Sequence, residues 1–276
     1  MLLGAALRLA VIFLPPDAMF EHGRNVVIEE LQRGNAAWDL RRGPILPLYD
    51  YQLNHFWGGS ALYSWLAIPV LAVLGDTLPV LRLLTIVFSL LSIACIHQLM
   101  VRSEGLLGAR IGAGLVAFAP PGYVLTSCYA YGTHMESNAM SMALVCMWIW
   151  WRRLPEGDGW ASLIFGFFVG VCAWFGYGLW LTIGVLAVLD GASLLARPRR
   201  IAWIKVAGGF MVGFAPWVAF MLAHPSTAMH VYDRPAWAYF DTAEWLDGLG
   251  SKLSSMVTED APAAMWFHPA FGSAGR

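Results

Sequence analysis

The chain has 276 residues, of which 58% are hydrophobic and only 13% are charged. Because a soluble domain carries about 25% charged residues, this composition excludes a soluble monomer and predicts an all-α protein with several membrane-spanning helices. The formal net charge of −1 provides no basic field, so we expect no nucleic-acid partner. The four cysteines form no C-x-x-C pair, and neither a disulfide framework nor a zinc site is predicted.

Apolar runs along the chain predict the helices. A helix that crosses about 30 Å of hydrocarbon needs about 20 residues, so the stretch 160–196 is too long for one crossing. We expect the Gly-Tyr-Gly sequence at 176–178 to divide it with a tight turn. In chain order the apolar runs are 2–14, 61–74, 80–101, 111–125, 138–151, 160–175, 179–196 and 201–223.

Basic residues gather in three short loops and predict the orientation. By the positive-inside rule these loops are cytoplasmic, whereas the connections 126–137 and 176–178 contain no Lys or Arg and lie outside. The N-terminus is then cytoplasmic. The basic residues are Arg102 and Arg110 around the first loop, Arg152 and Arg153 in the second, and Arg197, Arg199, Arg200 and Lys205 in the third.

The run 61–74 does not fit this alternation as a crossing. If the run 80–101 ends inside, it begins outside, so the run 61–74 starts and ends on the outer side. We therefore expect it to lie in the outer leaflet, although an ordinary eighth crossing is the alternative. The prediction is seven crossings in a membrane module of residues 1–223, with a first outer loop at 15–79 and an outer-side segment at 224–276 that begins a truncated domain.

The first outer loop contains a predicted surface helix. Val27, Ile28 and Leu31 recur at helical spacing, and Gly34 can end the helix as a C-cap. We expect this short helix to lie on the membrane surface.

Two acidic residues are candidates for chemistry at the outer face. Glu21 follows the first span, and Glu136 precedes the run 138–151, so both would lie at one depth on one side. A carboxylate whose pKa is raised by partial burial can act as a general base toward a hydroxyl. The alternatives are a solvated loop charge for Glu21 and, for Glu136, an acid stabilised by a helix dipole.

Other polar residues of the first loop are candidates for substrate binding. Arg41, Arg42 and His55 can bind the phosphate of a lipid-linked substrate, or they can attract anionic headgroups. Asp50 can position a sugar against neighbouring aromatic rings, or it can cap a turn. We expect two further charges, Arg82 and Asp190, to snorkel from the ends of apolar runs.

The order of these features resembles the GT-C superfamily of integral membrane glycosyltransferases. The resemblance extends over essentially the whole chain. It is greatest for the bacterial branch related to protein O-mannosyltransferases and aminoarabinose lipid A transferases. The motifs that carry it are Phe20-Glu21-His22-Gly23, Leu81-Arg82-Leu83, Ala119-Pro120-Pro121 and Gly132-Thr133-His134-Met135-Glu136.

The resemblance implies an inverting transfer in the bacterial inner membrane. The donor would be a polyprenyl-phosphate-linked sugar, and the acceptor a glycan, a lipid or a protein on the outer side. Glu21 would be the catalytic base, with Asp17 as a competitor because Phe20 stands where many members have an acid. His134 and Glu136 would orient the sugar or the acceptor. A divalent ion, if one is used, would be held by Glu21 and Glu136.

Two other functions fit a protein of this composition. A multi-span transporter would have charged or broken helices near the middle of the bilayer, whereas here the middle of each run is almost purely apolar. An O-antigen ligase or polymerase would rely on outer Arg and His residues more than on a first-loop acid.

The predicted topology can be tested by cysteine labelling. Glu21 and Glu136 can share one site only if the run 61–74 does not cross. In a background without native cysteines, we expect Asp76→Cys and Thr133→Cys to react from outside with an impermeant thiol reagent. Ser103→Cys should react only after the membrane is opened. Protection of position 76 together with labelling of position 103 would contradict the shared site.

Overall fold

The computed structural model confirms that the protein is all-α. Within the described residues, the other regular structure is a short antiparallel pair of β1 (His230–Val231) and β2 (Arg234–Pro235). The residues described are 2–13, 24–43, 59–130, 132, 135–154, 159–176, 178–196, 200–223, 230–231, 234–235 and 254. The helices are α1 (Leu2–Ile12), α3 (Arg24–Arg42), α4 (Gly59–Leu74), α5 (Leu78–Ser103), α6 (Gly105–Ala117), α7 (Pro121–Thr126), α8 (Met135–Arg153), α9 (Gly159–Phe175), α10 (Leu179–Ala196) and α11 (Arg200–Ala223).

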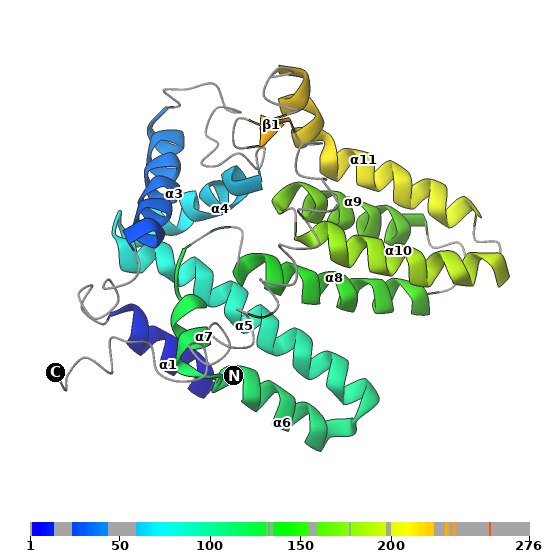
Figure 1. The fold of residues 1–276 in the computed structure, drawn as a ribbon, viewed down its shortest axis with the longest axis horizontal. Coiled ribbons are helices and arrows are strands. Elements are labelled where there is room, and N and C mark those ends of the chain that lie inside the picture. Colours follow the sequence, from blue (N-terminus) through cyan, green and yellow to red (C-terminus); the bar gives the residue numbers. More distant parts are fainter. Residues whose placement is uncertain are drawn as a thin grey trace.

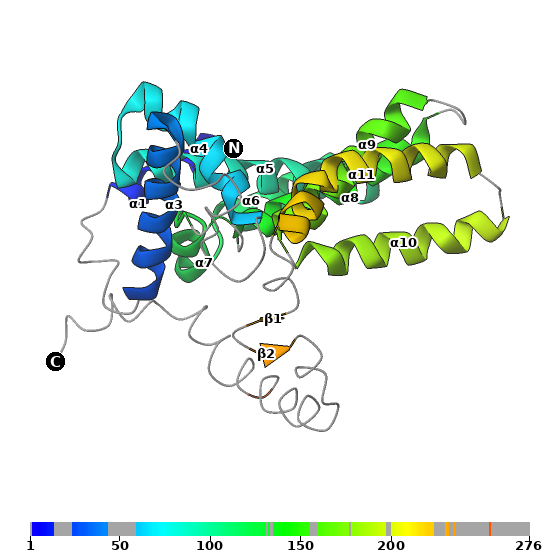
Figure 2. The ribbon, with the colours of Figure 1, turned by 90° about the horizontal axis from the view of Figure 1, so that it is seen from above.

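The helices that flank the predicted basic loops end on the same side of the molecule. In Figure 1 the C-terminal ends of α5, α8 and α10 and the N-terminal ends of α6, α9 and α11 lie toward the right, whereas α3, α4 and α7 lie toward the left. Figure 2 shows the same separation from above. This arrangement agrees with the alternation expected from the basic loops.

Two described helices are long and apolar enough to cross a membrane. They are α5 and the part of α11 from Ala202 to Ala219, and five further apolar helices or helix segments are shorter. Large apolar side chains also point outward from α9, α10 and α11, among them Trp160, Leu181 and Ile204, each more than 70% exposed. Such a surface suits lipid better than water. These features support a membrane protein, and the number of seven crossings stays a prediction.

Glycines bring α9 and α11 into direct backbone contact. Gly166 and Gly170 on α9 face Gly209 and Gly213 on α11, and each pair is spaced as G-x-x-x-G. A Cβ atom at Gly170 would lie 2.3 Å from the carbonyl oxygen of Phe210. Small residues at this spacing let helix backbones approach closely in a membrane, where packing replaces the hydrophobic effect.

The run 160–196 is divided as predicted, but the run 111–125 is not one helix. The helix α6 ends at Ala117, and α7 begins after Pro120. Pro120 and Pro121 cannot donate backbone hydrogen bonds, which favours a break here. The fully buried Arg8 donates to the carbonyl oxygens of Val116 and Ala117, at 3.2 and 2.9 Å, and thus satisfies acceptors that the end of α6 leaves open.

The first-loop helix does not end at Gly34, so that prediction is wrong. The helix α3 continues to Arg42 and ends at Gly43, whose φ of 121° is the left-handed conformation that glycine adopts readily. Gly34 instead lies against α5, where a Cβ atom would be 3.5 Å from Leu81 Cδ2. Gly34 therefore lies inside the helix, in ordinary contact distance of Leu81, and does not terminate it.

Alanine substitutions should destabilise the protein at glycines that contact the backbone of another helix, and not at glycines that have free space around them. We expect Gly170→Ala and Gly213→Ala to reduce the free energy of unfolding by about 1–3 kcal/mol, because each methyl group would overlap the partner helix. Gly184→Ala on α10 is the control, since nothing lies within 4 Å of its Cβ position. Unfolding in detergent measures the difference, and equal stability of the three variants would contradict the contact.

Candidate functional site

Charged side chains are buried together where α3, α4, α5 and α8 meet. Glu30 and Arg33 lie on α3, Arg82 on α5 and Glu136 at the start of α8, and none is more than 2% exposed. Glu30, Arg33 and the buried Ala37 are three and four residues apart, so they share one face of α3. Buried charges are costly unless they are paired, which makes this group a candidate site.

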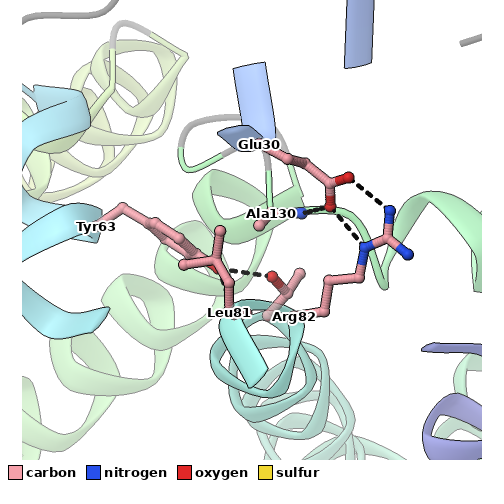
Figure 3. A network of polar contacts seen from close by, with 6 residues as sticks. Glu30, Tyr63, Leu81, Arg82 and Ala130 are labelled. Carbon is pink, nitrogen blue, oxygen red and sulfur yellow. Dashed lines mark hydrogen bonds and ion pairs between the residues drawn. The ribbon is translucent and has the colours of Figure 1, made fainter. Parts of the chain in front are cut away.

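Glu30 and Arg82 form a two-point ion pair (Figure 3). Arg82 Nε donates to Glu30 Oε1 at 2.9 Å, and Arg82 Nη2 donates to Glu30 Oε2 at 2.6 Å. The backbone N–H of Ala130 also donates to Oε1, at 2.7 Å. The pair therefore fastens α3 both to α5 and to the segment that leads to α8.

The prediction that Arg82 and Asp190 snorkel toward water is wrong. Arg82 is 2% exposed and bound to Glu30, and Asp190 is 4% exposed and forms an ion pair with Arg152 at 3.3 Å. In both cases a charged partner on another helix replaces water. The prediction failed because both partners are distant along the chain and cannot be identified from local sequence.

The helix α4 supplies buried hydroxyl groups that hold this region together. The hydroxyl of Tyr63 donates to the carbonyl oxygen of Leu81 at 3.1 Å and also lies 2.9 Å from Thr85 Oγ1. Ser64 Oγ donates to the carbonyl oxygen of Arg33 at 3.2 Å. In this way α4 is linked to both α5 and α3 beside the ion pair.

Glu136 is fully buried, and neither of its carboxylate oxygens has a hydrogen-bond partner among the described residues. It lies in the first turn of α8, before the apolar run 138–151. Burial raises the pKa of this carboxyl to about 7. The nearby backbone N–H groups of Glu136 itself and of Gly132, followed by Arg33, lower the pKa and oppose this rise. Glu136 can therefore exchange a proton near neutral pH.

The turn before Glu136 lies directly on Arg33 and Tyr63. Gly132 has a φ of 79°, and a Cβ atom there would be 2.7 Å from Arg33 Nε and 3.2 Å from Tyr63 Cβ. Only glycine combines this backbone conformation with so close an approach. The first-loop helix α3 and the segment before α8 are thus in contact, as expected if both lie on one side of a membrane.

The structure describes some of the predicted site residues and not others. Arg41 forms an ion pair with Asp76, and Arg42 stacks on the Trp38 ring with its Cζ atom 4.0 Å from the ring centre. Both lie at the C-terminal end of α3, outside the buried group, so the structure does not bring them to Glu136. The residues Asp17, Glu21, Asp50, His55 and His134 lie outside the described residues, and their roles stay predictions.

A metal site is not formed by the part of the chain that the structure describes. No group of three or more His, Cys, Asp or Glu side chains there is placed to hold an ion. The described side chains around Glu136 include the cation Arg33, a poor neighbour for a divalent metal. The expected metal ligand Glu21 lies outside the described residues, so we derive no step through a metal.

Three of the buried charges were not identified as site residues from sequence. Glu30 and Arg33 lie in or next to the predicted first-loop helix but were given no role, and Arg82 was expected to snorkel. One available signal was Arg82 itself, because an arginine in an apolar run requires a partner. Its partner is 52 positions away, and several acids of the first loop fit that role equally well in sequence.

Comparisons of the chain with protein-family models, with curated proteins and with solved structures found no match. The function is therefore argued from the buried group and from the sequence pattern.

Breaking the buried ion pair should be far more costly than breaking an exposed one. We expect Glu30→Gln or Arg82→Met alone to reduce the free energy of unfolding by about 3–5 kcal/mol, because each leaves its partner buried without a counter-charge. Arg41→Met removes a matched but exposed arginine–carboxylate pair and should cost about 0–1 kcal/mol.

The double variant Glu30→Gln/Arg82→Met tests the coupling. It should recover part of the loss, since it leaves no unpaired charge. Denaturation in detergent measures all four proteins. Additive single losses, or losses no larger than that of Arg41→Met, would contradict the role of the pair.

Proposed function

We propose that the protein is a membrane glycosyltransferase that moves a sugar from a polyprenyl-phosphate carrier to an acceptor at the outer face of the membrane. The observation that carries the proposal is the Glu136 carboxyl, which is buried and without a hydrogen bond beside Arg33. It lies where α3 and the segment before α8 meet. The sequence pattern contributes the reaction class, and the buried acid contributes a group able to perform it.

Glu136 acts as the general base in this proposal. The acceptor hydroxyl oxygen forms a bond to the anomeric carbon, and its proton passes to Glu136. The bond from that carbon to the phosphate oxygen breaks, and its electron pair leaves with the polyprenyl phosphate. At neutral pH about half of a carboxyl with a pKa of about 7 is ionised and can accept the proton. Its basicity is also higher than that of an ordinary carboxylate, which favours the proton transfer.

Other acids are less suited to the same role. The two oxygens of Glu30 already accept three hydrogen bonds, from Arg82 and Ala130, so this residue is a structural anchor. Glu21 remains the candidate that the family resemblance implies. A pair of acids at this depth would let one accept the proton while the other orients the sugar.

A transporter is the second candidate, because one observation favours it. The broken helix between α6 and α7, with the buried Arg8 beside it, is the kind of feature that transporters use for binding. However, the Arg8 guanidinium donates to three carbonyl oxygens and to Ser89 Oγ, which accounts for the charge structurally. A transferase therefore agrees better with the described residues.

A transfer assay in proteoliposomes tests the proposal. The donor is a polyprenyl-phosphate hexose with a labelled sugar, and the acceptor is a glycan and lipid extract of bacterial envelopes. We expect Glu136→Gln to reduce transfer by about 10²–10⁴-fold. The rate for the unmodified protein should rise with pH through about 7, where Glu136 loses its proton, and this rise should disappear in the variant.

The control is Glu104→Gln, which changes an exposed acid at the turn between α5 and α6 and should leave transfer unchanged. Full transfer by Glu136→Gln would exclude Glu136 as the base. If Glu21→Gln instead removes the pH dependence, Glu21 is the base. Movement of an intact solute across sealed vesicles without cleavage of the donor would favour the transporter.

A further inference from the structure

A cavity of about 340 Å³ lies beside the buried ion pair, between α3 and the turn that joins α4 to α5. Its size is at the lower end of the range for small-molecule sites. An apolar part of the cavity wall is formed by Leu71, Leu78 and Leu81. The buried side chain of Glu30 forms another part of the wall. The remaining wall includes Asn35 and Trp38 of α3 and Asp76 and Thr77 of the turn.

The polar part of this cavity is held in a defined geometry. Arg41 binds Asp76 Oδ2 and so connects the end of α3 to the turn. Arg42 stacks on Trp38, yet the indole keeps 37% of its surface exposed. An aromatic ring, an amide, a carboxylate and a hydroxyl are therefore presented together by two rigid elements.

The side chains that line the cavity favour a neutral polyhydroxyl ligand. The charged residues that line it are both acidic, Glu30 and Asp76, and no described cation lines it. Each acid is already paired with an arginine, so the site does not need a cationic ligand. A sugar ring fits this environment, because its C–H faces can pack on Trp38 and the leucines while its hydroxyls bond to the polar side chains.

We propose that this cavity binds the terminal sugar of the acceptor, which makes the acceptor a glycan or a glycolipid. The proposal rests on the proposed function and narrows its substrate. We expect the donor phosphate elsewhere, because the two arginines next to the cavity, Arg41 and Arg42, are already engaged with Asp76 and Trp38. The cavity lies beside the buried group, because Glu30 forms part of its wall and also binds Ala130 in the segment that leads to Glu136.

Binding of simple sugars to the purified full chain tests this site. The probes are the methyl glycosides of glucose, galactose, mannose and N-acetylglucosamine. Saturation-transfer NMR in detergent measures their binding. We expect at least one to bind, and Trp38→Leu to weaken its binding by about tenfold through loss of the aromatic contact. Asn35→Ala, at an exposed position on α3, should also weaken it.

The matched control is Trp160→Leu, which removes a 77% exposed tryptophan at the N-terminal end of α9 and should leave binding unchanged. Farnesyl phosphate, a soluble analogue of the carrier, should not displace the sugar. The proposal is overturned if no glycoside binds, if farnesyl phosphate displaces it, or if Trp38→Leu and Asn35→Ala bind as the unmodified protein does. Donor cleavage that depends on Glu136 would then still stand, so the two failures are distinguishable.

Discussion

The ion pair between Glu30 and Arg82 fixes the part of the molecule that could perform chemistry. Both charges are removed from solvent, and their desolvation is offset only because two Arg82 nitrogens and the Ala130 N–H all bond to one carboxylate. These three donors and the acceptor come from α3, α5 and the segment before α8. Separating any one of these would leave a buried charge without a partner, so the three segments keep one relative position. The location of Glu136 follows from it.

The charge balance of the buried group explains why Glu136 is suited to proton exchange. Glu30 and Arg82 neutralise each other, which leaves Arg33 as the cation nearest to Glu136 in this group. With Glu136 protonated the group carries one net positive charge, and with Glu136 ionised it carries none. Burial favours the protonated form, whereas the backbone N–H groups of Glu136 and Gly132, and then Arg33, favour the ionised form, and these opposing effects give a pKa of about 7. Gly132 is required in this arrangement because any side chain there would collide with Arg33.

Sequence patterns predicted the local features well and the long-range ones poorly. The apolar runs indicated the helices, and the Gly-Tyr-Gly sequence after Phe175 indicated the division between α9 and α10. Gly34 was misinterpreted because a glycine inside a helix and a glycine that ends one look alike in sequence. Arg82 was misinterpreted because its partner is distant along the chain. Glu136 was identified since an acid at the start of an apolar run is conspicuous, but its burial depends on α3 and α4.

Two parts of the chain pack their helices by different contacts: glycines in one part and buried charges in the other. In α9 and α11 four glycines bring the two backbones into contact, and no buried ion pair between these helices is found among the described residues. In the part from α1 to α8 buried charges make the contacts between segments: Arg8 donates to the carbonyl oxygens at the end of α6, and Glu30 binds Arg82 and the Ala130 N–H. Charged side chains that are bound to carbonyl oxygens or to one another cannot easily change position during transport of a solute. They can hold a catalytic acid and a neighbouring cavity in place, which is what a transferase requires and what a transporter would have to give up during each cycle.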